Sequence, residues 1–437
     1  MLLHYIDLSW RSFKRTPMVS VLMVLAIAIG IGVTMTSLSV YYMMAKDPIP
    51  SKSGQLFHVQ LQTMDEGNTY WSKDNMPLQL TYQDAMYLLD ANLPYKRTAM
   101  YKSGFSVHLD NDQVKPFKEA TRMASKDIFH MFNLEFIYGG AWTQQQQDDI
   151  APVVVISKRI NDKLFNGENS VGKHLYLDDM RLQVVGIIED WNTPVKYYDT
   201  NNGSFKPAEG IFMPITIGAA NEIFTWGNTN GWKNEDANTF SDLLVSESLW
   251  LQFWVELNNG QEKSDFEQLL MNYMIQQQSL GRFNREKLSF NLFNVTEFMA
   301  YRGVVKEDNK IMVTLSFMFL AVCVANILSL LLAKFLRRAP EVGVRRALGA
   351  SKWQVFYQHL VEVSLLGVFG GLLGIVVAQL GLWGVRVSNS TYHEIANMDL
   401  NMLLTAPAIA IVACIIAGLY PAWLVCRTTP AVYLKTQ

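Results

Sequence analysis

The stretch that decides the fold is MVSVLMVLAIAIGIGVTMTSLSVYYMM, residues 18–44, which contains no Asp, Glu, Lys or Arg. A helix needs about 20 mostly apolar residues to cross the hydrocarbon core of a bilayer. Three further stretches meet this requirement: 311–335, 355–385 with its apolar part from Val363 to Val385, and 403–425. Because a helix buried in a water-soluble protein is rarely apolar on all sides over this length, the sequence predicts four membrane-spanning helices.

The first apolar stretch could also be a cleavable signal peptide. It is longer than the apolar region of such a peptide, which has about 7 to 15 residues, and no cleavage pattern follows it. We therefore expect residues 18–44 to remain in the mature protein as the first span.

Basic residues next to the spans predict the orientation of the chain, because Lys and Arg are retained on the cytoplasmic side. They are concentrated in residues 1–17, expected to form an amphipathic N-terminal helix, in the loop 336–354 and in the tail 426–437. The short loop 386–402 has a single Arg. This pattern predicts a multi-pass protein of the cytoplasmic, or inner, membrane with both termini in the cytoplasm and residues 45–310 outside it.

Composition excludes several other classes of protein. The 437 residues include 37 Lys and Arg against 39 Asp and Glu, so the net charge of -2 gives no general attraction to nucleic acid. Three cysteines are too few for a disulfide framework. Residues 46–310 contain 25 basic and 34 acidic residues, which is typical of a solvated surface.

The long extracytoplasmic segment has the pattern of a mixed α+β domain. Runs rich in β-branched and aromatic residues predict strands at 56–61, 153–156, 182–188 and 251–257. Helical spacing predicts helices at 81–93, 157–165 and 265–278, with Thr81 and Ser264 as N-caps. Residues 192–242 are rich in Asn, Gly, Thr and Trp and lack periodicity, which indicates a loop-rich insertion.

No pattern in the sequence indicates an enzyme, a catalytic residue or a metal site. The segment GENSVGK, residues 167–173, fits part of a phosphate-binding loop, but His174 replaces the Ser or Thr that holds magnesium. A helical segment precedes it and a strand-like one follows, the reverse of the order such a loop requires. We interpret it as a glycine-containing turn and expect no cofactor in this chain.

The cytoplasmic loop contains RRAPEVGVRRALGAS, residues 337–351. This resembles the motif R-x-x-E-I-G-V-R-R-A-L-G-A-S, which joins the second and third spans in permeases of the ABC-transporter family that includes the macrolide exporter MacB, the lipoprotein-release permeases and the cell-division permease FtsX. From Glu341 to Ser351 the only difference is Val342 in place of Ile. Residues 153–157, 170–173 and 184–188 are similar to the core of the MacB-type periplasmic domain, and Gly418–Ala422 with Thr429–Ala431 resembles the family's last span and tail.

The resemblance implies that 336–354 is a coupling loop that receives ATP-driven motion. A short helix there can dock on a soluble partner, and Glu341 near its start is favoured by the helix dipole. The expected coupling residues are Glu341, Val342, Gly343, Arg345, Arg346, Ala347, Leu348 and Gly349. MacB itself has a fused ATPase, which is absent from this sequence, so ATP and magnesium are expected on a separate ABC ATPase subunit dimer. Further expected partners are a second permease copy or a paralogue, membrane lipids, and a periplasmic adaptor with an outer-membrane channel.

Small residues in the spans predict close contacts between helices. The expected packing residues are Ala28, Gly32, Gly367, Gly370, Gly371 and Gly374. Glu362 is the acidic residue at membrane depth, and we expect it to snorkel or to pair near the interface rather than to relay protons.

Four hypotheses for the function remain open at this point. The leading one is export of a substrate from the periplasm by mechanotransmission, in which ATP hydrolysis moves the outer domain. The same architecture would serve lipoprotein release, or FtsX-like regulation and sensing in the cell envelope. A receptor without an ATPase would leave the motif around Glu341 unexplained.

Overall fold

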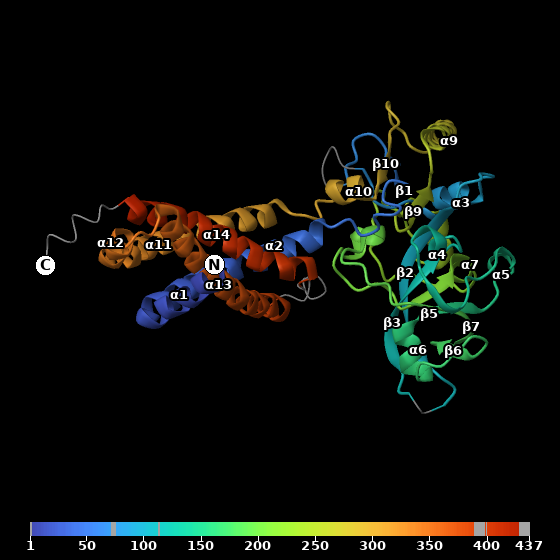
Figure 1. Ribbon diagram of the computed structural model, residues 1–437. Coiled ribbons are helices and arrows are strands. Elements are labelled where there is room, and N and C mark those ends of the chain that lie inside the picture. The colour runs from blue at the N-terminus through green and yellow to red at the C-terminus, as the bar shows by residue number, and fades with distance from the viewer. Residues whose placement is uncertain (1, 71–75, 112–113, 389–397, 399, 428–437) are drawn as a thin grey trace. The chain divides into compact units, whose positions relative to one another are not determined.

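A computed structural model describes residues 2–70, 76–111, 114–388, 398 and 400–427 (Figure 1). The chain forms two compact units, one of Met1–Lys46 with Val305–Gln437 and one of Asp47–Val304, which are described separately below. Most of the predicted outer loop 386–402, the motif Thr429–Ala431 and nearly all of the tail 426–437 lie outside the described residues.

The first unit is helical. Its helices are α1 (Leu2–Arg15), α2 (Pro17–Ala45), α11 (Glu307–Arg337), α12 (Ala339–Ala347), α13 (Lys352–Ser388) and α14 (Leu400–Arg427). Within the described residues four of them, α2, α11, α13 and α14, are long and apolar enough to cross a membrane. The prediction of four spans is therefore confirmed.

The second unit is built on a mixed sheet, which in the described residues has ten strands. The strand order is β10-β1-β9-β2-β3-β8-β5-β7-β4, and β6 pairs with β2 and β7. The pairs β3–β8 and β5–β7 are parallel and the others are antiparallel. The strands are β1 (Leu56–Leu61), β2 (Arg97–His108), β3 (Phe117–Ala124), β4 (Phe136–Gly139), β5 (Val153–Ser157), β6 (His174–Leu177), β7 (Met180–Ile188), β8 (Ile211–Pro214), β9 (Gln252–Glu256) and β10 (Phe290–Asn294).

Helices connect and cover these strands. They are α3 (Tyr82–Asp90), α4 (Ile128–Met131), α5 (Gln144–Asp148), α6 (Lys158–Phe165), the 3-10 helix η1 (Tyr197–Asn202), α7 (Ile215–Ala220), α8 (Phe240–Val245), α9 (Gly260–Ser279) and α10 (Val295–Tyr301). The predicted strands β1, β5, β7 and β9 and the predicted helices α3, α6 and α9 are confirmed.

The two predicted helix caps have different outcomes. Thr81 caps α3, since its side chain accepts a hydrogen bond from the backbone N–H of Asp84. Ser264 does not cap α9. This helix starts at Gly260 and is capped by Asn259. The predicted start was too late because the first turn is polar and the apolar periodicity begins only at Phe266.

The sheet is covered on both faces. Along β9, Phe253 and Val255 belong to one apolar cluster and Trp254 to the other. Successive side chains of a strand point to opposite faces, so the two clusters lie on opposite faces of the sheet. A strand in the middle of this sheet therefore has no solvent-facing side, which explains why every residue of β9 is buried.

The expectation that residues 192–242 form a loop-rich insertion is wrong for part of this segment. It contains η1, β8, α7 and the start of α8, and β8 lies inside the sheet between β3 and β5. The apolar part of β8 is only Ile211–Met213, which is too short to stand out in the sequence. Its neighbours in the sheet, rather than its own pattern, define it as a strand.

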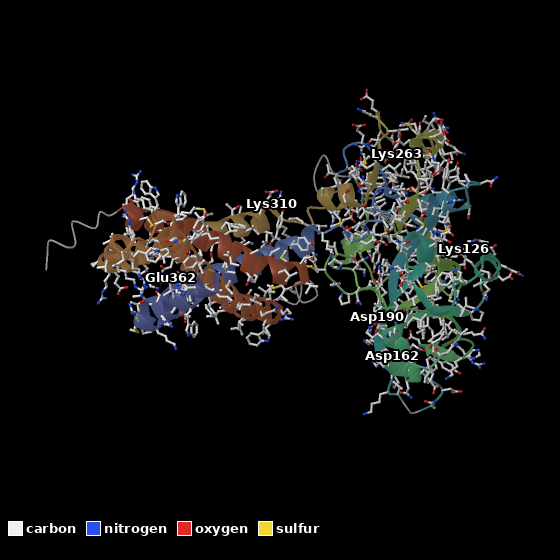
Figure 2. The ribbon with its side chains drawn as sticks, in the orientation of Figure 1. Lys126, Asp162, Asp190, Lys263, Lys310 and Glu362 are labelled. Atoms are coloured by element: carbon white, nitrogen blue, oxygen red, sulfur yellow. The ribbon has the colours of Figure 1, made fainter. Side chains whose placement is uncertain are left out.

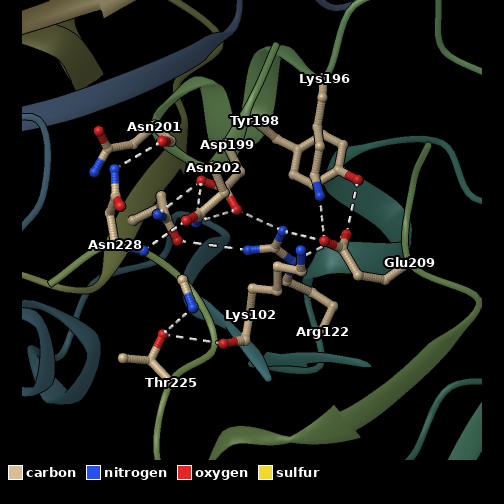
Figure 3. A network of polar contacts seen from close by, with 12 residues as sticks. Lys102, Arg122, Lys196, Tyr198, Asp199, Asn201, Asn202, Glu209, Thr225 and Asn228 are labelled. Carbon is tan, nitrogen blue, oxygen red and sulfur yellow. Dashed lines mark hydrogen bonds and ion pairs between the residues drawn. The ribbon is translucent and has the colours of Figure 1, made fainter. Parts of the chain in front are cut away.

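A buried ionic network joins the η1 segment to the sheet (Figure 3). The Arg122 guanidinium lies 2.7 Å from Asp199 Oδ2 and 2.7 Å from Glu209 Oε1. Lys196 also pairs with Glu209, and the Tyr198 hydroxyl donates a hydrogen bond to the same carboxylate. Two cations face two carboxylates, so the network is neutral although its four charged side chains are almost completely buried.

The charges in this network stabilise each other against burial. Burial alone would raise the pKa of Glu209, but Arg122 and Lys196 outweigh it and lower the pKa to about 2. The same carboxylates raise the pKa of Arg122 in spite of its burial. Glu209 and Arg122 are therefore charged at neutral pH, and the removal of one would leave the other buried without its main counter-charge.

We predict that Arg122→Ala destabilises the second unit by about 3–5 kcal/mol, because two buried carboxylates lose their main partner. Urea denaturation of a fragment spanning residues 47–304 measures this change. Arg159→Ala is the matched control, since Arg159 pairs with Glu119 at 2.7 Å but is half exposed. The control should cost less than about 1 kcal/mol. If the two substitutions lowered the free energy of unfolding equally, the proposed contribution of the buried network to stability would be contradicted.

A second prediction concerns His58 on β1, which stacks on Phe298 and is completely buried. Burial, with a contribution from Arg302, lowers its pKa to about 3. The folded state therefore keeps His58 neutral while the unfolded chain takes up a proton below pH 6.5, so stability falls as the pH decreases through this range. Urea denaturation of the same fragment should show a loss of roughly 2 kcal/mol from this residue between pH 7 and pH 5. In His58→Phe the dependence should be weaker by this amount, and an unchanged slope would refute the assignment.

Candidate functional site

The cytoplasmic motif folds into a short helix, α12. Arg338 separates it from α11, and Pro340 stands in its first turn, where a missing N–H costs nothing. Glu341 is the acidic residue of this turn. The helix ends at Ala347 with Leu348 as its C-cap, and Gly349 has a φ of +103°, which lets the chain turn into α13. The expected short helix is therefore confirmed.

The predicted coupling residues divide between two faces of α12. Val342 and Gly343 are buried and Arg346 is half-buried. The exposed residues are Glu341, Arg345, Ala347, Leu348 and Gly349, together with Val344. Leu348 is 83% exposed, a high value for a large apolar side chain. One face of α12 thus packs on the helical unit and the other presents an acidic, a basic and an apolar group to the solvent.

Three polar contacts connect α12 to neighbouring helices. Arg15 of α1 pairs with Glu341 at 3.1 Å, and Arg345 donates a hydrogen bond to Gln358 of α13 at 3.2 Å. Arg346 donates to the backbone oxygen of Cys426 in α14 at 3.1 Å. The Arg15–Glu341 pair is more than half exposed on both sides and contributes little energy. The buried residues of α12, rather than its ion pair, fix its position.

Glu362 lies among the helices of this unit, and of the two expected alternatives it is paired rather than snorkelling (Figure 2). Its carboxylate is 2.7 Å from the Lys334 ammonium of α11 and 3.8 Å from Arg338, and it accepts a hydrogen bond from Ser12 of α1. Lys334 also donates to Ser20 of α2 at 3.4 Å. Lys334 and Glu362 are almost completely buried. This cluster therefore joins α1, α2, α11 and α13 next to the point where α12 begins.

The predicted packing residues lie at helix contacts. A Cβ added to Gly367 or Gly371 would come within 2.8 Å of backbone atoms of α14, at Ile411 and Pro407. A Cβ on Gly370 or Gly374 would meet α2 instead, at 2.4 Å from Ile27 and 2.9 Å from Ile31. Gly32 faces Val377 of α13 in the same way, and Ala28 is buried beside Gly374. Gly367 and Gly371 thus form a close-contact surface for α14, and Gly370 and Gly374 form one for α2.

The glycine-rich segment 167–173 is a turn between α6 and β6. Gly167 and Gly172 have positive φ values, and Lys173 pairs with Glu168 at 3.3 Å on the surface. The order helix, turn, strand agrees with the interpretation as a turn. Within the described ranges no group of three or more His, Cys, Asp or Glu side chains could hold a metal ion.

The architecture is that of a multi-pass membrane protein with a large mixed domain inserted after its first span. Residues 20–273 match the family described as MacB-like periplasmic core domain, and residues 313–430 match the FtsX-like permease C-terminal family. The chain therefore belongs to the MacB/FtsX family of ABC-transporter permeases.

Curated relatives have low sequence identity to this chain. The macrolide export ATP-binding/permease protein MacB of Syntrophobacter fumaroxidans is 23% identical over 325 residues, which cover 68% of this chain and 45% of that protein. The pyoverdine export ATP-binding/permease protein PvdT of Pseudomonas syringae is 23% identical over 308 residues, or 70% and 41%. This chain thus spans less than half the length of these relatives.

Solved structures with a similar region include two extracytoplasmic domains. The periplasmic region of MacB from Actinobacillus actinomycetemcomitans is 14% identical, with a TM-score of 0.37, and the match covers 60% of this chain and 97% of that one. The extracellular domain of the noncanonic ABC-type transporter YknZ from Gram-positive bacteria is 11% identical, with a TM-score of 0.34, and the match covers 55% and 100%.

We predict that Glu362→Gln lowers the stability of the helical unit by about 3–5 kcal/mol, because Lys334 remains buried without its counter-charge. The thermal unfolding midpoint of the purified protein in detergent measures this loss. Glu307→Gln is the control, since Glu307 pairs with Lys310 at 2.7 Å on an exposed surface. The double substitution Lys334→Met with Glu362→Met should recover most of the stability, and a failure to recover would show that the cluster acts through more than its charge.

Proposed function

We propose that this chain is the transmembrane subunit of an ABC exporter that converts ATP hydrolysis on a partner into movement of its extracytoplasmic domain. The observation that carries the proposal is the exposed face of α12. Leu348, Glu341 and Arg345 lie on the solvent side of a helix whose other face is packed on the spans. A small apolar group between charges is typical of a surface that docks on a soluble protein.

The partner in this proposal is a dimer of ABC ATPase subunits, which binds ATP and magnesium. An ATPase bound to α12 would move the ends of α11 and α13 directly. Arg338 connects α11 to α12, and α13 begins at Lys352, after the turn that follows α12. Rotation of α12 would be transmitted to the spans through the buried Lys334–Glu362 pair, since this pair connects the two helices.

The proposed location is the cytoplasmic membrane, with α12 and both termini in the cytoplasm. The basic residues of α1, α12 and their flanks support this orientation. The acidic segment 47–304 then lies outside, where its sheet, covered on both faces, would move as one rigid body. A second copy or a paralogue would complete the transport unit.

Export is favoured over the alternatives because two relatives are named for macrolide export and pyoverdine export. In this proposal the outer domain expels a substrate from the periplasm through an adaptor and an outer-membrane channel. Gentle solubilisation of the tagged protein from its native membranes, followed by mass spectrometry, tests the assembly. An ATPase recovered with an adaptor supports export, whereas an ATPase with lipoproteins or a cell-wall hydrolase would move the assignment to lipoprotein release or regulation.

We predict that Leu348→Glu lowers recovery of the ATPase subunit by roughly tenfold or more, because a charge replaces a central apolar contact. The yield of ATPase per permease in the same purification measures this effect. Val245→Glu, at a side chain that is 70% exposed in the outer domain, is the matched control and should leave the yield unchanged. An unchanged ATPase yield with Leu348→Glu would remove α12 as the docking element.

A further inference from the structure

One side of α11 is not covered by the other helices of its unit, and α11 is the least buried of the four spans. The residues that bury α11 against its neighbours, such as Leu320, Cys323 and Ile327, lie on the other side of the helix. The exposed residues on the uncovered side, the α11 seam, recur at alternating steps of four and three: Leu315, Phe319, Val322, Asn326, Ser329 and Ala333. This average step of 3.5 residues is the one at which two helices pack along their whole length.

Asn326 places an amide in the middle of this otherwise apolar surface. It lies about 4.5 Å along the helix axis from Cys323, the central residue of the apolar stretch 311–335. Its side chain is exposed, and within the described residues it makes no hydrogen bond. Lipid chains supply neither donors nor acceptors, so contact with lipid alone would leave this amide without a partner. The α11 seam therefore requires a partner with a polar group at the level of Asn326.

Polar side chains of the other spans have different surroundings. The hydroxyls of Thr34 and Thr36 in α2 donate hydrogen bonds to backbone oxygens of their own helix at 2.8 Å. Gln379 of α13 is exposed, but it lies near the end of its apolar stretch at Val385, and its longer side chain can reach the interface. The amide of Asn326 is short and lies near the membrane centre, so it has no such exit.

A second copy of this chain meets the requirement through its own α11. Copies with the same orientation in the membrane bring these helices together in parallel, and a two-fold axis places Asn326 opposite Asn326 of the partner subunit. An amide is both donor and acceptor, so the two side chains can exchange hydrogen bonds. A single asparagine in such a seam also fixes the register and the number of helices. Ser329 and Ala333 are small and allow the helices to approach closely on the side of α12.

We infer that two copies of this chain form a homodimer along the α11 seam, held in register by hydrogen bonds between their Asn326 side chains. The inference rests on the proposed function, which needs a second copy or a paralogue, and it names the copy and its contact surface. A paralogue without a polar side chain at this level would leave Asn326 unpaired, so identical chains are favoured. The seam ends at Ala333, about two turns before α12, so the contact would also bring the two docking helices together.

The test measures self-association of the purified full chain in lipid vesicles without ATPase. Energy transfer between donor-labelled and acceptor-labelled copies is followed as the lipid-to-protein ratio is raised. Asn326→Leu should weaken association by about threefold to thirtyfold, the range for one hydrogen bond between spans. Asn326→Gln keeps the amide and should retain most of the affinity. Because this side chain is exposed on its own chain, both replacements leave the fold of the single copy intact.

Gln379→Leu is the matched control, because it removes an exposed amide from α13 instead of α11. Its association should equal that of the unchanged chain. Absence of self-association in the unchanged chain, or equal losses with Asn326→Leu and Gln379→Leu, would overturn the inference. Leu348→Glu should leave the energy transfer unchanged while it lowers ATPase recovery, so failure of the dimer contact and failure of ATPase docking are distinguishable.

Disulfide cross-linking locates the contact within α11. In a variant whose native cysteines are replaced by alanine, Val322→Cys should give cross-linked dimers under mild oxidation, because Val322 lies on the seam next to the two-fold axis. Ala321→Cys is the control, since Ala321 is also exposed but lies outside the repeat. Equal cross-linking at the two positions would show that the copies do not meet along this seam.

Discussion

The helical unit depends on how closely its spans can approach α13. Lipid chains are as apolar as leucine, so helices in a membrane associate through close van der Waals contact rather than through the hydrophobic effect. Gly367 and Gly371 admit the backbone of α14, while Gly370 and Gly374 admit side chains of α2. A methyl group at any of the four would come within 3 Å of a neighbouring atom. The position of α13 between two partners therefore follows from four residues without side chains.

Among the described residues of this unit, Lys334 and Glu362 are the buried side chains of opposite charge. The Lys334–Glu362 pair lies at the ends of the spans next to α12, where Ser12, Ser20 and Arg338 complete its contacts. An unpaired charge at this depth would be costly, so each partner requires the other. The glycines of α13 set its distance from α2 and α14. The ion pair connects α11 and α13 beside α12. The close helix contacts and the ion pair together fix the start of α12 relative to the spans.

The sequence was sufficient to predict the spans, α12 and the strands with strong apolar runs, because these elements have a simple periodicity. It was insufficient for β2 and β3. Both faces of the sheet are buried, so polar residues such as Thr98, Ser103 and Arg122 occur at buried positions and no alternation appears. The same limit applies to the ionic site. Glu362 could be expected to pair, but its partner on α11 depends on the register between two helices, which no local pattern contains.

The two buried ionic clusters hold segments that the apolar pattern does not specify. The η1 segment is rich in Asn and Tyr, and α1 is strongly polar on one side, so neither would be placed by burial of apolar side chains alone. In each case one carboxylate, Glu209 or Glu362, is shared by groups from separate parts of the chain. Displacement of η1 would take Asp199 away from Arg122, and displacement of α1 would remove the Ser12 hydrogen bond from Glu362. These buried polar contacts thus restrict each segment to the arrangement in which its partner is satisfied.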